Sequence, residues 1–452
     1  MLLLTGGERL INLILQYDKR VKYSMNAVLA SVDKLGLSRV FLSKSLEESI
    51  HLASKISQEG KCVYAVSLLT TMLADEAYLA SLMETVQRIR EKGCLTIIGG
   101  PHASGDPYGA LSVLGFDFAF IGEGEKAIAD FLTALENNTD VHSVKGLAYR
   151  DRETGRISFT GRGKPVNLDD YDPFPYWRGI VNPIEITRGC SFGCFYCQVS
   201  YLHGFALRHR SIDKIVEYAE ITMKLGMRDL RFISPDSLSY GSLLSTSPVN
   251  MEKIESLMEG LQAKTAQHGG RIFFGSFPSE VRPEHAQEDV LKVIRKYVAN
   301  NELIIGGQSG SERILKLVRR GHGVGEIESA VESAVKAGFT PSVDFIIGFP
   351  GETEEDMLST LKLAEKLVGK GAKIHLHYYI PLPGTPLGLR KPAPLPVKVR
   401  REWSRLVGAG KAYGSWLTQE TISWKIIELF EKGFIYPRQA GLSSAQLPHP
   451  SA

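Results

Sequence analysis

Short apolar runs alternate with amphipathic stretches along residues 10–136. The runs predict buried strands, and the stretches between them, apolar on one face at helical spacing, predict helices. The predicted strands are 12–17, 39–42, 61–68, 94–99 and 116–121, and the predicted helices are 24–35, 46–56, 75–92 and 125–135. Strand–helix alternation with short connections predicts an α/β fold with a Rossmann-like, doubly wound parallel sheet, whose ligands lie at the carboxyl ends of the strands.

The alternation stops after residue 137 and resumes at 183. Within the interruption, Gly146–Arg150 and Arg156–Thr160 flank a polar turn and predict a β-hairpin, and the proline-rich segment 172–177 predicts an extended strap. Six strands then follow, near 183–187, 229–234, 271–276, 302–307, 342–347 and 373–380. The helices expected between them are 211–225, 250–266, 286–299, 325–337 and 354–369. Six strands joined by helices predict a partial (β/α)6 TIM-type barrel.

Two more helices, 397–412 and 414–432, are predicted after the barrel, and the end, 446–452, is expected to be disordered. The expected domains are 1–137 (Rossmann-like), 138–181 (linker with hairpin), 182–386 (barrel) and 387–452 (small helical region). We expect the last region to shape the mouth of the barrel.

Composition narrows the class of protein without identifying it. The 452 residues carry 53 Lys and Arg against 50 Asp and Glu, so the net charge is 53 − 50 = +3, and 43% of residues are hydrophobic. This balance is typical of a folded globular protein and gives no reason to expect a nucleic-acid surface. No apolar run reaches the roughly 18 residues of a membrane span, and the first nine residues lack the pattern of a secretory signal. A cytoplasmic protein is expected.

The five cysteines fall into two groups. Cys62 and Cys94 stand alone in separate apolar runs and are expected to be buried packing residues. Cys190, Cys194 and Cys197 lie close together, directly after a predicted strand. Three thiolates at this spacing can hold three irons of a cubane cluster and leave the fourth iron open. The alternative is a structural zinc ion, which needs a fourth ligand such as His203 or His209.

The Cys-x3-Cys-x2-Cys spacing, with Tyr196 before the last cysteine, resembles the radical S-adenosylmethionine (SAM) superfamily. The resemblance implies a [4Fe-4S] cluster whose open iron chelates SAM. It also implies an electron donor such as ferredoxin or flavodoxin, anaerobic chemistry, and a 5′-deoxyadenosyl radical as the reactive species. Gly189 and Gly193 would let the cysteine loop wrap closely around the cluster.

Later segments resemble the same superfamily in the expected order, over roughly 183–386. The resemblance implies SAM contacts by Ser234, Pro235 and Asp236 at the methionine amine, Gln308 and Ser309 at the ribose, Arg320 at the carboxylate, and Ile347 and Phe349 at adenine. Arg319 could serve in place of Arg320, because both guanidinium groups match a carboxylate. The expected catalytic residues are Asp236, His377 and Tyr378. His375, two residues before His377, is expected on the same face of its strand and could also position substrate or move a proton.

The N-terminal half resembles the cobalamin-binding domain that is joined to many such enzymes. The residues implied to contact cobalamin follow the predicted strands: Tyr17, Ser67, Thr70, Thr71, Gly99, Gly100, Pro101, His102, Ala103, Gly122, Glu123, Gly124 and Glu125. The Asp-x-His-x-x-Gly loop that supplies a cobalt ligand in other cobalamin proteins is missing. We therefore expect a lower cobalt face without histidine, facing the loop 17–23. The alternative is a degenerate domain that no longer binds cobalamin.

Both cofactors together imply a class B-like radical SAM methyltransferase that methylates an unactivated carbon. A rearrangement or cyclisation enzyme and a noncatalytic metal- or cobalamin-binding module remain as alternatives. Methylthiotransferase relatives usually carry three further N-terminal cysteines, and this chain has only Cys62 and Cys94 there. The expected substrate is a peptide, protein or small molecule, with a slight preference for a protein such as methyl-coenzyme M reductase.

Overall fold

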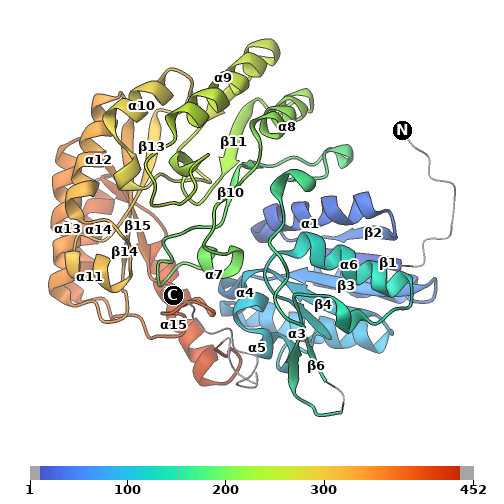
Figure 1. The fold of residues 1–452 in the computed structure, drawn as a ribbon. Coiled ribbons are helices and arrows are strands. Elements are labelled where there is room, and N and C mark those ends of the chain that lie inside the picture. The colour runs from blue at the N-terminus through green and yellow to red at the C-terminus, as the bar shows by residue number, and fades with distance from the viewer. Residues whose placement is uncertain (1–10, 152, 438–452) are drawn as a thin grey trace. The chain divides into compact units, whose positions relative to one another are not determined.

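The computed structural model describes residues 11–151 and 153–437, and its elements are labelled in Figure 1. The chain forms two compact units. Among the described residues, unit 1 takes 11–151, 153–166, Asp170–Pro175 and 428–437, and unit 2 takes Asn167–Asp169 and Tyr176–Ile427. No helix within the described ranges is long and apolar enough to cross a membrane. The expected disordered end, 446–452, lies outside the described residues.

Unit 1 is built on a seven-stranded sheet of order β2-β1-β3-β4-β5-β6-β7. Its strands are β1 Ile11–Gln16, β2 Ser38–Ser43, β3 Lys61–Ser67, β4 Leu95–Gly99, β5 Phe118–Phe120, β6 Leu147–Arg150 and β7 Ile157–Phe159. The first five pair in parallel, and β6 and β7 form an antiparallel hairpin in which β6 pairs with β5. The hairpin predicted around the polar turn is therefore confirmed.

Helices lie on both faces of this sheet, which confirms the doubly wound prediction (Figure 1). Helices α1 (Lys22–Leu35) and α6 (Gly124–Glu136) pack together, as do α2 (Leu46–Ile56) and α3 (Glu76–Glu91). Short helices α4 (Gly100–Gly105) and α5 (Pro107–Ser112) follow β4 directly. The strand order reverses between β1 and β3, and ligands of such sheets bind at the carboxyl ends of the strands beside that reversal.

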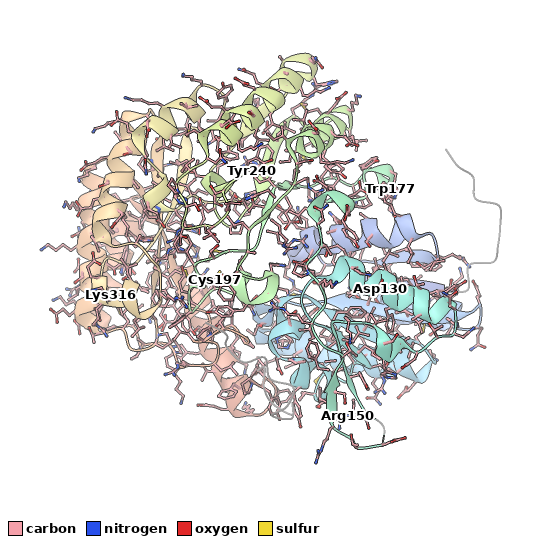
Figure 2. All side chains as sticks on the ribbon, in the orientation of Figure 1. Asp130, Arg150, Trp177, Cys197, Tyr240 and Lys316 are labelled. Atoms are coloured by element: carbon pink, nitrogen blue, oxygen red, sulfur yellow. A yellow bond between two sulfur atoms is a disulfide. The ribbon has the colours of Figure 1, made fainter. Side chains whose placement is uncertain are left out.

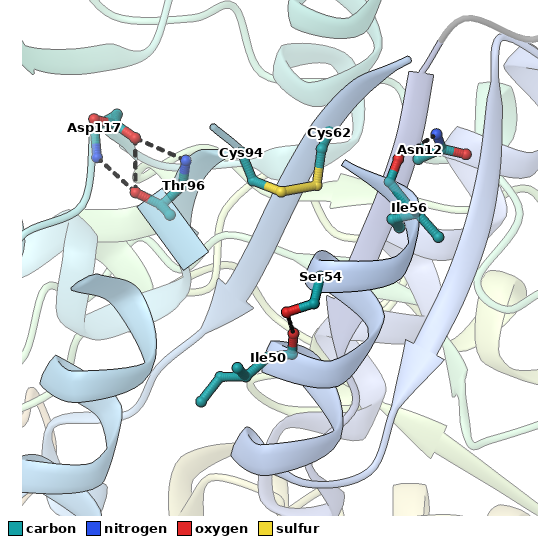
Figure 3. The surroundings of a disulfide bond; sticks show 8 residues. All are labelled: Asn12, Ile50, Ser54, Ile56, Cys62, Cys94, Thr96 and Asp117. Atoms are coloured by element: carbon teal, nitrogen blue, oxygen red, sulfur yellow. Dashed lines mark hydrogen bonds between the residues drawn. A yellow bond between two sulfur atoms is a disulfide. The ribbon is translucent and has the colours of Figure 1, made fainter. Parts of the chain in front are cut away.

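The expectation that Cys62 and Cys94 stand alone is wrong. Both are buried, but they form a disulfide with a Cα–Cα distance of 4.5 Å, shown in Figure 3. The cause is the pairing of β3 with β4, in which Val63 lies opposite Leu95, so that the two preceding cysteines also lie opposite each other. A spacing of 32 residues gives no sign of that register.

Unit 2 contains the second set of parallel strands. They are β8 Ile184–Glu185, β11 Asp229–Ile233, β12 Arg271–Phe273, β13 Glu302–Gln308, β14 Thr340–Ile347, β15 Lys373–Tyr378 and β16 Ala412–Tyr413. One sheet runs β12-β11-β8 and the other β13-β14-β15-β16, and a parallel bridge from Val281 to Ile305 follows β12. A small antiparallel ribbon, β9 (Thr187–Arg188) with β10 (Arg208–His209), follows β8. The array agrees with the predicted partial barrel.

Seven helices of unit 2 lie close to the predicted positions, and the two short helices Val199–His203 and Glu312–Leu317 correspond to no predicted helix. The helices of this unit are α7 Val199–His203, α8 Ile212–Lys224, α9 Met251–His268, α10 Glu288–Arg295, α11 Glu312–Leu317, α12 Val324–Lys336, α13 Glu354–Gly369, α14 Val397–Gly408 and α15 Trp416–Glu431. The helix predicted over 397–412 is too long, because Ala412 and Tyr413 leave it and pair with β15 as the short strand β16. A strand of two residues is too short to show a period in the sequence.

Candidate active site

The cysteine loop begins directly after the short strand β9. Gly189 and Gly193 both have positive φ values, 90° and 62°. A Cβ atom at Gly189 would lie 2.1 Å from the carbonyl oxygen of Ala206, so no other residue fits there without moving the backbone. The Phe195 amide donates to the carbonyl of Val318 at 2.9 Å, which ties the loop to the end of α11.

All three cysteines line one cavity of about 470 Å³ in unit 2. Seven other predicted site residues line it as well: Tyr196, Ser234, Pro235, Gln308, Arg320, His377 and Tyr378. Figure 2 places Cys197 in the loop that leads into α7. The structure thus collects predicted residues from four separate strand ends around one space.

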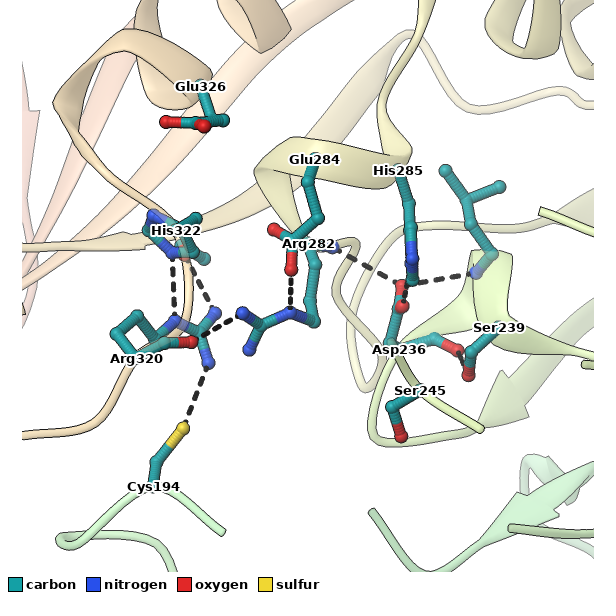
Figure 4. A network of polar contacts seen from close by, with 12 residues as sticks. Cys194, Asp236, Ser239, Ser245, Arg282, Glu284, His285, Arg320, His322 and Glu326 are labelled. Carbon is teal, nitrogen blue, oxygen red and sulfur yellow. Dashed lines mark hydrogen bonds and ion pairs between the residues drawn. The ribbon is translucent and has the colours of Figure 1, made fainter. Parts of the chain in front are cut away.

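Arg320 holds a fixed position in the wall of this cavity. Figure 4 shows its guanidinium contacting the Cys194 Sγ at 3.8 Å, and it also donates to the Gly306 carbonyl at 2.8 Å. Its Nε donates to His322 Nε2 at 3.0 Å. Arg319 is exposed, whereas Arg320 is buried, so the two arginines that the sequence left open are not equivalent.

Three polar side chains converge at Gly306. A Cβ atom there would lie 2.6 Å from Arg320 Nη2, 2.9 Å from Gln308 Nε2 and 2.9 Å from Glu280 Oε2. Burial raises the pKa of Glu280 to about 7, with Arg320 opposing the rise and Asp344 adding to it. Gln308 has a positive φ of 71°, a conformation rare for a residue with a side chain, at an irregularity in the β13–β14 pairing.

Asp236 does not line the cavity, although the sequence places it at the methionine amine. Its carboxylate lies 2.5 Å from His285 Nδ1 and accepts from the backbone amides of Leu238 and Arg282 (Figure 4). Two acidic side chains do line the cavity, Glu280 and Asp344, and sequence reasoning missed both; Glu280 is the one beside Arg320 and Gln308. Glu280 belongs to no motif, and the available signal was an acidic side chain in the segment after the third barrel strand.

Three other predicted SAM contacts also do not line the cavity. The Ser309 hydroxyl lies 3.2 Å from Thr360 Oγ1 of α13 and is fully buried. Ile347 and Phe349 are buried as well, and Phe349 packs against Tyr196 with ring centroids 5.3 Å apart. On β14 it is Asp344 and Ile346 that line the cavity, because alternate side chains of a strand point to opposite faces.

The end of β15 contributes His377 and Tyr378 to the wall. The Tyr378 hydroxyl donates to the Ala393 carbonyl at 2.7 Å, so its proton is directed at the backbone. His377 Nδ1 lies 3.1 Å from the amide nitrogen of Gln419, and burial lowers the pKa of this histidine. Gln419 and Asp344 line the cavity too, and neither belongs to a motif in the sequence.

The predicted cobalamin contacts gather at the carboxyl ends of the strands of unit 1. Tyr17 follows β1 and its hydroxyl donates to Asn26 at 2.7 Å, while Ser67 at the end of β3 lies 3.4 Å from Ser24. Gly100, with a φ of +89°, has no room for a Cβ, which would lie 2.7 Å from the Ser67 hydroxyl. This edge is therefore shaped by small residues beside the reversal in strand order.

The other members of this set have mixed surroundings. Gly99, Pro101, Thr71, Gly122, Glu123 and Gly124 are partly exposed, and Thr70, His102, Ala103 and Glu125 are buried. Thr70 Oγ1 lies 3.1 Å from His102 Nδ1, and the other ring nitrogen lies 4.0 Å from Asp106 Oδ2. Burial lowers the pKa of His102 to about 4. The ring is enclosed within unit 1, and a lower cobalt face without histidine stays a prediction.

The distances between the cysteine sulfur atoms distinguish a site for an iron–sulfur cluster from a site for a single zinc ion. A tetrahedral zinc site with Zn–S bonds of about 2.3 Å keeps its sulfur atoms within roughly 4 Å of one another. In the described parts of the chain, the one group of three or more metal-type ligands whose atoms lie within 4.8 Å of one another is Asp344, His375 and His377, and it includes no cysteine. Both ring nitrogens of His209 already contact Thr187 and Ser242, so this histidine does not complete a zinc site. The donor set fits a larger iron–sulfur cluster.

Comparison with known proteins agrees with this geometry. Residues 184–364 match the model of the radical SAM superfamily. An uncharacterized methyltransferase of Pyrococcus horikoshii is 25% identical over 74% of this chain and 70% of its own length. A tRNA-2-methylthio-N(6)-dimethylallyladenosine synthase of Aromatoleum aromaticum is 30% identical, and the alignment covers 62% of each chain. The chain thus spans less than two thirds of that tRNA-modifying relative.

Solved structures show the same fold over most of the chain. The radical SAM methyltransferase TsrM from Kitasatospora setae, solved with cobalamin and a [4Fe-4S] cluster, has a TM-score of 0.67 at 16% identity and covers 84% of this chain and 77% of its own. The cobalamin-dependent radical enzyme OxsB has a TM-score of 0.63 at 13% identity, over 89% of this chain and 55% of its own. Residues 184–364 are therefore a radical SAM domain, in a chain that has the fold of cobalamin-dependent radical SAM enzymes.

Proposed function

We propose that this chain is a cobalamin-dependent radical SAM methyltransferase that methylates an unactivated carbon. The observation that carries the proposal is the convergence of the three cysteines with Arg320, Gln308 and Glu280 on one cavity. When bound, the [4Fe-4S] cluster and SAM supply the radical that removes a hydrogen atom from the substrate, and cobalamin supplies the methyl group. The cysteines would hold the cluster, and the strand ends of unit 1 would hold cobalamin.

The polar groups of the cavity support binding of the methionine part of SAM. Arg320 presents a fixed cation for the carboxylate, and Glu280 presents an acidic oxygen for the amine, beside Gln308. The buried guanidinium keeps its position through the Gly306 carbonyl and His322, so little side-chain entropy is lost on binding. Glu280 therefore takes the role that the sequence assigned to Asp236. Asp236 instead positions the loop after β11.

The acceptor carbon in this proposal belongs to a peptide or protein, as in methyl-coenzyme M reductase, and the support is the family resemblance alone. His377 and Gln419 form the wall that faces such a substrate, and Tyr378 fixes that wall through its bond to Ala393. An electron donor of the ferredoxin or flavodoxin class completes the proposal.

The disulfide bears on the methylthiotransferase alternative. Cys62 and Cys94 are bonded to each other and cannot serve as metal ligands in that state. Among the described residues, the free thiols are those of Cys190, Cys194 and Cys197. Within the described residues, unit 1 therefore has no free thiol to match the three further N-terminal cysteines that methylthiotransferase relatives usually carry.

The deciding experiment is anaerobic reconstitution with iron, sulfide and cobalamin, followed by mass spectrometry of a peptide panel with SAM and reductant. A product heavier by one methyl group, with label transferred from methyl-labelled SAM, supports the proposal. A product that has the mass of the substrate, or that mass less the hydrogen lost, favours rearrangement or cyclisation. A colourless protein that retains zinc at the cysteines contradicts both radical assignments.

A further inference from the structure

A second group of metal-type ligands lies in the wall of the same cavity. Asp344 on β14 is directly opposite His375 on β15, and His377 lies two residues further on the same face. His375 Nδ1 lies 3.1 Å from Asp344 Oδ1 and 3.1 Å from His377 Nε2. One ligand atom from each of the three residues lies within 4.8 Å of the other two.

The protons of this group cannot satisfy all of these contacts. The Tyr378 amide must donate, so Gln419 Oε1 accepts from it at 2.9 Å, and the Gln419 amide nitrogen then donates to His377 Nδ1. Neutral His377 therefore carries its proton on Nε2, directed at His375 Nδ1. That single nitrogen cannot accept this proton and also donate to Asp344, so one of the two short contacts is left unsatisfied.

We propose that Asp344, His375 and His377 bind a divalent transition-metal ion of the zinc or iron(II) class, a site separate from the three cysteines. Two imidazole nitrogens and one carboxylate oxygen are a common ligand set for these ions. Tetrahedral bonds of about 2.0–2.1 Å place ligand atoms roughly 3.3 Å apart, close to the two observed separations. A cation among the three atoms replaces the contact that the protons leave unsatisfied.

The surroundings fix the ligands on one side and leave the other open. The His375 ring stacks on Tyr413 with centroids 4.6 Å apart and an interplanar angle of 7°, and the Tyr413 hydroxyl contacts Ser342 at 2.8 Å. Asp344 and His377 line the cavity, so a further coordination position faces it. Such a position takes water or an oxygen donor of the substrate, for example a carbonyl or carboxylate.

Metal binding by His377 would change the hydrogen bonds of Gln419. A histidine bound to metal through Nε2 carries its proton on Nδ1 and needs an acceptor there. The Gln419 side chain offers an N–H₂ group instead and must turn over, which places that group against the Tyr378 N–H. A carboxylate accepts from both groups, so Gln419→Glu is expected to tighten metal binding at least tenfold.

The test uses the full-length enzyme with its cluster reconstituted and then exposed to zinc. We expect one zinc per chain after gel filtration, with unchanged iron content and an X-ray absorption spectrum that shows nitrogen and oxygen but no sulfur ligands. His375→Ala, His377→Ala and Asp344→Asn are expected to weaken zinc binding at least a hundredfold. His142→Ala, which removes an exposed histidine beside Asp140 in unit 1, serves as the control and leaves zinc binding unchanged.

The readouts are independent of radical chemistry, because iron reports the cluster and zinc reports this site. No retained zinc in the wild-type enzyme, sulfur ligation, or zinc retention in His375→Ala each overturns the proposal. Iron content and far-ultraviolet circular dichroism exclude misfolding of the variants. The X-ray absorption spectrum of the wild-type enzyme identifies the zinc ligands even where a variant does not fold.

Discussion

His285 Nδ1 lies 2.5 Å from Asp236 Oδ2, in a buried pair that also ties down the backbone after β11. Burial alone would lower the pKa of His285, but the hydrogen bond and charge of Asp236 raise it above the ordinary value of 6.5. The folded state therefore keeps a proton that the unfolded state loses. The stability from this pair is complete below pH 6.5 and is lost as the pH rises through the folded value.

Asp236→Asn should remove this pH dependence. We expect the free energy of unfolding to fall by about 1–3 kcal/mol at pH 6, since a buried charged hydrogen bond is lost, and by less at pH 9. Urea unfolding at several pH values measures both quantities, and Glu259→Gln on the exposed face of α9 is the control. A large loss of SAM affinity with an unchanged unfolding curve would contradict this role and restore Asp236 as a cofactor ligand.

Arg320→Met should weaken SAM binding roughly tenfold to a hundredfold, the effect of losing a charged hydrogen bond to a carboxylate. Arg319→Met is the matched control, because that neighbouring guanidinium is exposed and the side chain does not line the cavity. Equilibrium dialysis with the reconstituted enzyme measures affinity, and iron analysis checks the cluster. Equal losses in both variants would show that overall charge, not the position of Arg320, governs binding.

Gly306→Ala should disturb the cavity without changing any charge. The new Cβ would lie within 3 Å of atoms of Arg320, Gln308 and Glu280, so at least one of these polar groups must move. We expect SAM affinity to fall at least tenfold while iron content is retained. In Gly325→Ala, at the start of α12, the added methyl group meets nothing within 4 Å and should leave affinity unchanged. Unaltered binding in Gly306→Ala would mean that the three groups do not hold SAM.

The disulfide should lower the number of reactive thiols that are measured before reduction. Of the five cysteines, two are bonded, so unfolding the cluster-free protein without reductant should expose three reactive thiols, and five after reduction. Closing a loop of 32 residues stabilises a folded chain by about 3–4 kcal/mol in the chain-entropy treatment. The double variant Cys62→Ala/Cys94→Ala should lose about this much in urea unfolding of unit 1. Five reactive thiols before reduction would contradict the bond.

The sequence predicted elements better than it predicted orientations. Strands such as β3 and helices such as α2 could be predicted from the spacing of apolar residues along the chain. The start of α2 could also be predicted, because Ser45 is a capping residue directly before an amphipathic run. The disulfide depends on the pairing of two strands that are distant in the sequence. Likewise, whether Ile346 or Ile347 faces the cavity depends on a one-residue register that an apolar run does not specify.

The candidate site shows the same division. The cysteine motif and Arg320 could be identified because their spacing is tied to chemistry, and the structure brings them together. Glu280, Asp344 and Gln419 come from segments without a motif and meet only when the strands are assembled. The roles of Ser309, Ile347 and Phe349 in cofactor binding stay predictions, since each is buried outside the cavity lining.

The disulfide lies where β3 and β4 begin, whereas the proposed cobalamin edge lies where the same strands end. A thiol reductant used while iron is loaded keeps the three cluster cysteines reduced, and its thiolate also attacks the Cys62–Cys94 disulfide. A preparation can therefore gain its cluster while losing a covalent brace that spectroscopy of the cluster does not report. The oxidation state of Cys62 and Cys94 would then affect purification yield and shelf life more than turnover.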